Sequence, residues 1–323
     1  MPWIERIKKE NPKEIYVISN VGLSYGDYLM LTPLFSALKE AYKDTDIIFC
    51  TEIDEEINIL YGNPNITSIM DFDHFMVVYQ GVDRKFAASF DGIYQIPSII
   101  RDSVFKNKNA YIAFCEDVGL TPNSYLPQYF IQPPERKKAQ DLLCQHNITK
   151  DDKLIILQTE ASSPMRNWHP DYTLDLAQRL SEKYKVILLG IYYEYFSEAI
   201  QDNQNIIPLI KKLSVRNACA LIEQADLVVA PDSLFAHIAG ALSQKGLILM
   251  SSFPAELRYS LMPTLTVLQK EYFCAPCMLH NLDCCSVGED QLLKTDRNGN
   301  YYSMPCMLSI SVDDVYEKVM QMV

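Results

Sequence analysis

Short apolar runs alternate with segments of helical spacing along most of the chain. The β-branched run at 14–19 predicts a buried strand, and the next apolar run, at 46–50, predicts a second one. Between them, the segment 32–43 repeats its apolar residues every three to four positions, which is typical of a helix with one buried face. This order of strand and helix indicates a parallel sheet with helices on its faces.

A second series of the same kind follows a charged segment at 133–148. It has apolar runs at 153–158, 185–190, 226–231 and 246–252, separated by helical patterns at 171–184, 215–225 and 233–244. We therefore expect two Rossmann-like domains, at 1–150 and 151–310, and a C-terminal helix at 311–323. Because open parallel sheets bind ligands at the carboxyl ends of their strands, the sequence predicts a site in a cleft where the two sheets face each other.

The composition is that of a globular protein, with 48% hydrophobic and 22% charged residues. A net charge of −12 disfavours nucleic acid as a partner, since phosphate neutralisation requires an excess of positive charge. The N-terminal MPWIERIKKE lacks the apolar core of a signal peptide, and no stretch reaches the roughly 18 apolar residues of a membrane span. Nine cysteines without such a signal indicate a reducing compartment, so we expect a cytoplasmic protein.

The strongest candidate for chemistry is the segment DLVVAPDSLFAH at 226–237. A buried strand ends at Pro231, and a helix begins beside Asp232 and Ser233. The free N–H groups and the positive dipole end of such a helix bind anions, with Ser233 as a further donor and His237 one turn along. The same residues also fit an ordinary helix cap, with His237 packed in the core.

Two loops add further candidates. Gly26 would let the backbone approach a ligand closely, and Asp27 beside it suits a general base that takes a proton from a sugar hydroxyl. Arg166 carries the planar fork of donors that clamps a diphosphate, and Glu194 follows a strand end, where a carboxylate can accept ribose hydroxyls. Each residue also fits a plain role, helix capping for Asp27 and solvent exposure for Arg166 and Glu194.

Cysteines gather near the C-terminus. The pair Cys274 and Cys277 is followed by Cys284, Cys285 and Cys306. Four thiolates from such a set would complete a tetrahedral zinc site, which would order a polar and turn-rich segment. The spacings are not those of a standard zinc finger, and a set of buried free thiols is the alternative.

Four segments resemble, in order, parts of the heptosyltransferase-type bacterial glycosyltransferases, a family 9-like group. GDYLMLTPLFSALKEAY is similar to the opening loop and helix of that family, and MRNWHPDYTLDLAQRL to its Lys-x-Trp-Pro segment. ADLVVAPDSLFAHIAGAL is similar to its Asp-Ser/Thr-Gly-x-x-His element. The CAPC segment, the later cysteines and ISVDDV resemble the C-terminus of many members. The resemblance runs from about residue 14 to 320.

The resemblance implies a GT-B fold, with the acceptor bound by the N-terminal half and a nucleotide-diphosphate-sugar by the C-terminal half. It also implies transfer with inversion and no metal in the chemical step. The family's general base falls on Asp27, its lysine on Arg166, and its strand-end glutamate on Glu194. Its phosphate-loop residues fall on Asp232, Ser233 and His237, which together would bind the donor.

Three departures from the family pattern leave the sugar, the nucleotide base and the acceptor open. Leu234 replaces the usual glycine, Arg166 replaces lysine, and residues 1–13 have no counterpart. A glycan or another hydroxyl compound is the expected acceptor. The alternatives are a nucleotide-sugar-binding protein without activity, which Leu234 favours, and a phage-type enzyme that glycosylates modified DNA bases.

Overall fold

The computed structural model describes residues 12–19, 23–53, 55–81, 93–95, 107–190, 196, 200, 203–278, 293–294 and 302–323. The chain divides into two compact units, Met1–Phe130 and Ile131–Val323. Helix α7 (Pro133–Gln145) lies in the second unit because it packs against α10 (Val215–Ile222). The sequence analysis placed the boundary after this helix, at 150, whereas the two units divide before it.

Two ion pairs join α7 to α10 and to the residue that ends it, Glu223. Arg216 on α10 forms a bidentate pair with Glu135 in the first turn of α7. Arg136 donates to both carboxylate oxygens of Glu223 at 2.8 Å. Such contacts depend on which helix lies opposite, which the local pattern of charges does not indicate.

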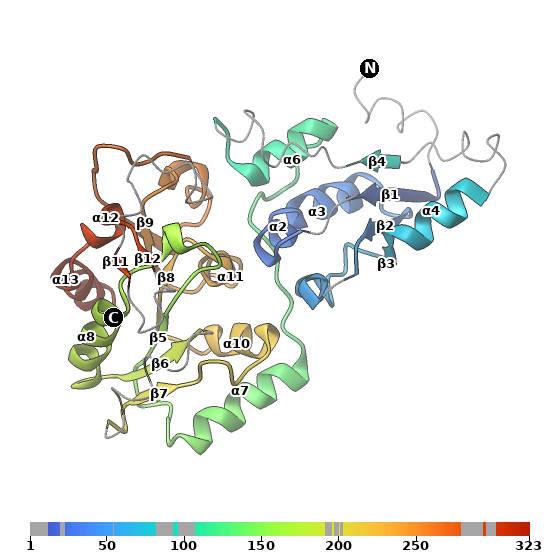
Figure 1. Ribbon diagram of the computed structural model, residues 1–323. Helices are drawn as coiled ribbons and strands as arrows, with labels where there is room; N and C mark the ends of the chain where they lie inside the picture. The colour runs from blue at the N-terminus through green and yellow to red at the C-terminus, as the bar shows by residue number, and fades with distance from the viewer. Residues whose placement is uncertain are drawn as a thin grey trace. The chain divides into compact units, whose positions relative to one another are not determined.

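The first unit contains a four-stranded parallel sheet with the order β3-β2-β1-β4 (Figure 1). Its strands are β1 (Glu14–Ile18), β2 (Asp46–Thr51), β3 (Ser68–Asp71) and β4 (Ile93–Gln95). The described helices are α2 (Tyr25–Met30), α3 (Thr32–Ala41), η1 (Glu55–Leu60), α4 (Phe72–Gly81) and α6 (Ala110–Val118). The sequence analysis predicted β1 and β2 but not β3 and β4, which are only four and three residues long. Gly119 ends α6 in the left-handed conformation, with φ 77°, which glycine adopts without steric cost.

The second unit contains a six-stranded parallel sheet with the order β10-β9-β8-β5-β6-β7. Its strands are β5 (Leu154–Gln158), β6 (Lys185–Leu189), β7 (Ile206–Pro208), β8 (Leu227–Pro231), β9 (Gly246–Met250) and β10 (Leu265–Gln269). Its other main helices are α8 (Pro170–Ser181), α11 (Leu234–Ala241) and α13 (Val312–Met322). Shorter elements are η3 (Pro164–Arg166), η4 (Ala255–Leu257), β11 (Leu293–Lys294), β12 (Tyr302–Ser303) and α12 (Pro305–Leu308). Within the described ranges, no helix is both long and apolar enough to cross a membrane.

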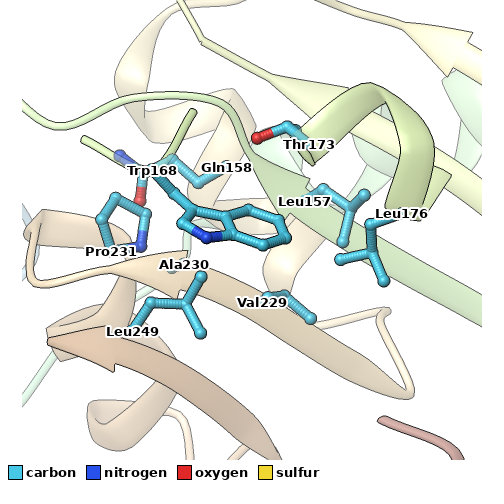
Figure 2. Close-up of a pocket in the computed structure, with 9 residues that line it drawn as sticks. All are labelled: Leu157, Gln158, Trp168, Thr173, Leu176, Val229, Ala230, Pro231 and Leu249. Carbon is cyan, nitrogen blue, oxygen red and sulfur yellow. The ribbon is translucent and has the colours of Figure 1, made fainter. Parts of the chain in front are cut away.

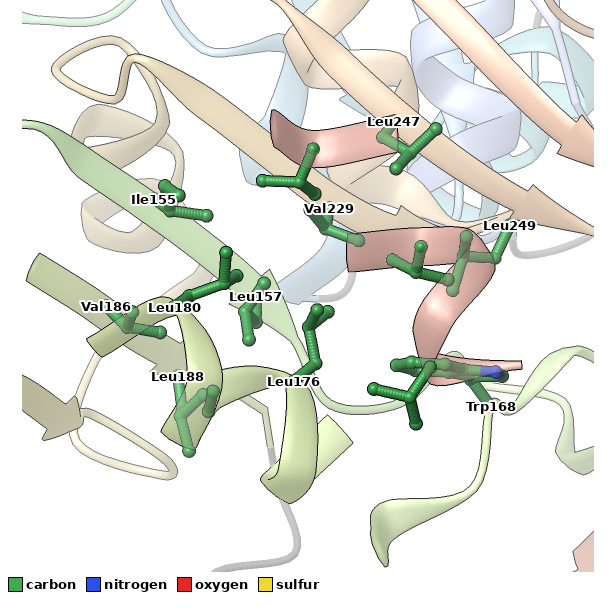
Figure 3. Close-up of a cluster of buried hydrophobic side chains, with 14 of the residues drawn as sticks. Ile155, Leu157, Trp168, Leu176, Leu180, Val186, Leu188, Val229, Leu247 and Leu249 are labelled. Atoms are coloured by element: carbon green, nitrogen blue, oxygen red, sulfur yellow. The ribbon is translucent and has the colours of Figure 1, made fainter. Parts of the chain in front are cut away.

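The core of the second unit lies between its sheet and the helices α8 and α13, which pack together (Figures 1 and 3). Leu157, Val229 and Leu249 project from three neighbouring strands, and Leu176 meets them from α8 (Figure 3). These side chains are 3% exposed or less, so the apolar runs of the sequence form a fully buried parallel sheet.

In both sheets the later strands lie first on one side of the first strand of the sheet and then on its other side. In the second sheet the chain runs from β5 outwards through β6 and β7, then returns to the other side of β5 at β8. In the first sheet β2 and β3 lie on one side of β1, and β4 lies on the other. The connections that leave β5 and β8 therefore run in opposite directions and leave room for a ligand. Arg166 and Asp232 follow β5 and β8, and Asp27 follows β1.

Candidate functional site

Asp232 is the centre of a buried polar cluster at the carboxyl end of β8. Its side chain is 5% exposed and accepts a hydrogen bond of 2.6 Å from the hydroxyl of Tyr259. Arg166 donates through Nη1 to the backbone oxygen of Asp232 at 2.7 Å, and the same nitrogen lies 4.0 Å from Oδ2. The carboxylate is thus held by neighbouring side chains and does not itself point into solvent.

The charge of Asp232 is maintained by two arginines. Burial alone would raise the pKa of this carboxyl. The positive charges of Arg258 and Arg166, together with the hydrogen bond from Tyr259, lower the pKa by more than burial raises it, so it lies below its ordinary value. A buried carboxylate with such partners stays ionised at neutral pH.

His237 lies one turn into α11 and is neutral at neutral pH. Its Nε2 is 3.9 Å from Oδ1 of Asp232, and its ring stacks on Tyr259 with the centroids 5.0 Å apart. Burial lowers the pKa of His237 to about 4; Asp232 opposes this shift, and Arg258 adds to it. A neutral imidazole keeps one donor and one acceptor nitrogen, and it can donate a hydrogen bond without carrying a charge.

The first turn of α11 has no side-chain cap in the described part of the chain. Ser233 occupies the cap position, but its hydroxyl donates to Oε1 of Gln158, at the end of β5. The sequence analysis expected this hydroxyl to face an anion or cap the helix, and here it instead joins β8 to β5. The first N–H groups of the helix therefore remain available to an anion, next to the half-buried Leu234.

Arg166 lies in the short helix η3, close to the start of α11. Its Nη2 donates to the hydroxyl of Ser162 at 2.9 Å, while its Nε is buried and has no partner among the described residues. The structure thus brings together four of the donor-site residues expected from sequence, Arg166, Asp232, Ser233 and His237. Glu194 lies outside the described residues.

A small cavity of about 10 Å³ lies beneath this cluster (Figure 2). The indole of Trp168 forms one wall, and Leu176, Val229, Pro231 and Leu249 surround it (Figure 2). This volume is about that of a single water probe, so the cavity is a packing gap and not a ligand site. The Nε1 of Trp168 donates to the oxygen of Ile310 at 2.8 Å, which fixes the C-terminal segment to the loop after β5.

Several members of the cluster were not among the sequence candidates. Tyr259 and Arg258 follow β9, and Gln158 and Glu160 lie at the end of β5. Glu160 is 4% exposed and accepts a hydrogen bond from the hydroxyl of its neighbour Thr159. The only signal in the sequence is their position after an apolar run, at the carboxyl edge of the sheet.

In the first unit, Asp27 is the third residue of α2 and is half-buried. Its Oδ2 accepts hydrogen bonds from the backbone N–H of Ser24 at 3.1 Å and from the Ser24 hydroxyl at 2.7 Å. Asp27 therefore caps the helix through one oxygen, and among the described residues Oδ1 has no hydrogen-bond partner. Gly26 precedes it, and of the described residues a β-carbon placed there would meet only the hydroxyl of Ser24, at 3.9 Å.

The described cysteines of the C-terminal group are Cys274, Cys277 and Cys306, which are all partly exposed and form no disulfide among the described residues. Burial raises the pKa of Cys306, and the charges of the other two thiols also raise it, so the three lie near one another. In the described part of the chain, no three His, Cys, Asp or Glu side chains are arranged to hold a metal ion. Cys284 and Cys285 lie outside that part.

Comparison with known proteins matches residues 102–281 to the model of glycosyltransferase family 9 (heptosyltransferase). The chain is similar to the crystal structure of a family 9 glycosyltransferase from Veillonella parvula. That match has a TM-score of 0.69 and 18% identity and covers 96% of this chain and 97% of the other. A search of curated protein sequences found no match.

Two structures from E. coli are also similar. The ADP-heptose LPS heptosyltransferase II matches with a TM-score of 0.68 and 16% identity, over 96% of this chain and 98% of the other. The heptosyltransferase WaaC with ADP matches with a TM-score of 0.61 and 12% identity, over 96% of this chain and 100% of the other. These likenesses establish the GT-B fold.

Proposed function

The chain belongs to glycosyltransferase family 9, the heptosyltransferase family, and we propose that it transfers a sugar from a nucleotide-diphosphate donor to an acceptor hydroxyl. The observation that carries this proposal is that Arg166, Asp232, Ser233 and His237 lie together at the carboxyl ends of β5 and β8. This is where the order of strands in the second sheet changes from one side of β5 to the other. Family membership makes the protein a glycosyltransferase. The residues below are our assignment of its donor and acceptor sites.

The donor diphosphate binds at the first turn of α11. The uncapped N–H groups and the helix dipole favour an anion there, and Arg166 adds a positive charge. Asp232 does not contact the phosphates; it holds Arg166 and Tyr259 in place through the bonds described above. As the bond between the sugar and the diphosphate breaks, these groups stabilise the negative charge that develops on the leaving group.

Asp27 is the general base. Its carboxylate accepts the proton of the acceptor hydroxyl while the hydroxyl oxygen forms a bond to the anomeric carbon and the diphosphate leaves from the opposite side, which inverts that centre. The hydrogen bonds from Ser24 orient Oδ2, and the open space beside Gly26 would admit an acceptor. The first unit would thus hold a glycan or a similar acceptor, and the second unit the donor.

Thermal denaturation with a series of nucleoside diphosphates tests the donor site. The series starts with ADP, which one of the similar structures contains, and includes GDP, UDP and CDP. A ligand at one hundred times its dissociation constant should stabilise the folded state by about 2.7 kcal/mol and raise Tm by a few degrees. If no nucleoside diphosphate or nucleotide-sugar raises Tm, the donor site is wrong.

Replacing Asp27 by Asn tests the base. The variant should lose at least about a hundredfold in turnover while donor binding stays unchanged. Asp314→Asn is the control for the helix cap, because Asp314 accepts from the N–H and hydroxyl of Ser311 at the start of α13. Asp314 also forms an ion pair with Lys270, so its variant should lose at least as much stability as Asp27→Asn. If both variants lose turnover in proportion to lost stability, Asp27 only caps its helix.

A structural zinc ion held by Cys274, Cys277, Cys306 and either Cys284 or Cys285 is the second part of the proposal. The three described thiols lie near one another, and cysteine thiolates are zinc's preferred structural ligands. Elemental analysis should find about one zinc per chain, and Cys306→Ser should lower that content while Cys144→Ser, an exposed cysteine outside the group, does not. Equal metal content in the two variants, or no zinc in the wild type, would refute the site.

We also propose a cytoplasmic location, where nucleotide-sugars are available and thiols stay reduced. The seven cysteines of the described part of the chain form no disulfide there, and four of them lie outside the group near the C-terminus. Alkylation in intact cells, followed by mass spectrometry, should modify exposed Cys144. A disulfide-linked or secreted form of the chain would contradict this location.

A further inference from the structure

Gln158 lies at the carboxyl end of β5 and links this strand to the start of α11. The strands β5 and β8 are neighbours in the sheet, with Leu157 opposite Val229, so the residues that follow them lie close together. The Gln158 amide donates from Nε2 to the backbone oxygen of Glu160 at 2.7 Å, and its Oε1 accepts from the hydroxyl of Ser233. Both polar atoms of this side chain are therefore engaged.

The orientation of the Gln158 amide follows from its two partners. A backbone oxygen can only accept a hydrogen bond, so the amide nitrogen must face Glu160 and the amide oxygen must face Ser233. The amide oxygen can also only accept, whereas the Ser233 hydroxyl has a single proton to donate. Ser233 therefore donates that proton to Gln158 and has none left for a phosphate oxygen.

The place of Ser233 in the helix connects this bond to anion binding. Ser233 is the N-cap residue of α11, where a serine hydroxyl usually accepts from the N–H of the second or third helical residue. Those residues are Phe235 and Ala236, and in the described part of the chain the Ser233 side chain caps neither. Because the bond to Gln158 turns the hydroxyl towards β5, the N–H groups of the first turn stay available. A side-chain cap and a bound phosphate would compete for these donors.

We propose that Gln158 is a positioning residue for donor binding, which keeps the first turn of α11 uncapped by holding the Ser233 hydroxyl away from it. This inference rests on the donor site proposed above and deepens it. Without the amide, the hydroxyl can rotate onto the N–H of Phe235 or Ala236, and the diphosphate would then have to displace it. Gln158 thus acts through Ser233 and needs no contact of its own with the donor.

Calorimetric titration of the full chain tests the inference with ADP, or with whichever of GDP, UDP and CDP raises Tm most. The variants are Gln158→Met, which removes the amide but keeps the length of the side chain, Ser233→Ala, and the double variant. Gln244→Met is the matched control, because the Gln244 amide also donates to a backbone oxygen, that of Glu223 at 2.8 Å, but lies before β9, at the opposite edge of the sheet. Thermal denaturation without ligand reports the folding of each variant.

Gln158→Met should bind the diphosphate roughly fivefold more weakly, which is the effect of one N-cap hydrogen bond on an equilibrium constant. Adding Ser233→Ala to this variant should raise the affinity again, because no hydroxyl remains to cap the helix, whereas a merely structural role of Gln158 would not be reversed in this way. Unchanged affinity in Gln158→Met, an equal loss in Gln244→Met, or a double variant that binds no more tightly than Gln158→Met would overturn the role of Gln158 alone. If the wild type binds no nucleoside diphosphate, the donor site fails and this inference fails with it.

Discussion

Acidification should destabilise the second unit through His237. Burial lowers the pKa of this imidazole to about 4 in the folded chain, against an ordinary value of 6.5 in the unfolded chain. Between these two values the unfolded chain binds a proton that the folded chain does not bind. The free energy of unfolding therefore falls as the pH drops through 6.5, and the loss is complete only below about pH 4.

The size of the effect follows from the two pKa values. At pH 5 the unfolded imidazole is almost fully protonated and the folded one is largely neutral, which corresponds to a loss of about 2 kcal/mol relative to pH 7.5. Asp232 does not mask this loss. The pKa of Asp232 is lowered, so the stability that this carboxylate contributes is present above its ordinary pKa of 3.8 and is lost as the pH falls from that value towards the lower pKa of the folded chain.

Urea denaturation at pH 7.5 and pH 5 measures the effect. Trp168 is 4% exposed in the second unit, and in a Trp3→Phe background its fluorescence alone reports unfolding. Replacing His237 by Asn should reduce the difference between the two pH values by about 2 kcal/mol, because all other groups titrate equally in both proteins. If the variant and the parent lose the same stability between pH 7.5 and pH 5, His237 is not held neutral by its surroundings.

Three further predictions concern single contacts. Gly26→Ala should raise the free energy of unfolding by about 0.5–1 kcal/mol in urea titrations, since Gly26 lies inside α2 with open space around it. The same variant should transfer the sugar more slowly, because the added methyl group narrows the space through which the acceptor approaches. Tyr259→Phe should lower the free energy of unfolding by about 1–3 kcal/mol, because buried Asp232 loses a hydrogen-bond donor at 2.6 Å. A decrease of less than about 0.5 kcal/mol would contradict that contact. Trp168→Phe should lower the free energy of unfolding by about 1–3 kcal/mol, measured by circular dichroism, since the oxygen of Ile310 loses its donor. Unchanged stability would mean that this bond does not hold the C-terminal segment.

The central strands could be predicted from sequence because each is a continuous apolar run. The run at 226–231 corresponds to β8 (Leu227–Pro231), and Asp232 follows it directly. Because parallel strands end at the same edge, the sequence also predicted that Arg166 and Asp232 would lie in one region. The structure places Nη1 of Arg166 2.7 Å from the backbone oxygen of Asp232.

The missed features depend on contacts between distant segments. Strand β10 is only partly buried and, among the described strands, pairs on one side alone, so its residues lack the strong apolar pattern of a central strand. Tyr259 reaches Asp232 because β9 lies next to β8, and strand order is not encoded in any local pattern. For the same reason the sequence assigned the Ser233 hydroxyl to an anion, whereas Gln158 from a neighbouring strand accepts its hydrogen bond.

A crystal structure with a bound nucleoside diphosphate tests the central claim most directly. The account predicts that phosphate oxygens lie within about 3.2 Å of the backbone N–H groups at the start of α11, beside Ser233, with Arg166 contacting the same diphosphate. It would be contradicted by a fully occupied nucleotide whose phosphates bind elsewhere, with more than one layer of water between them and this helix start.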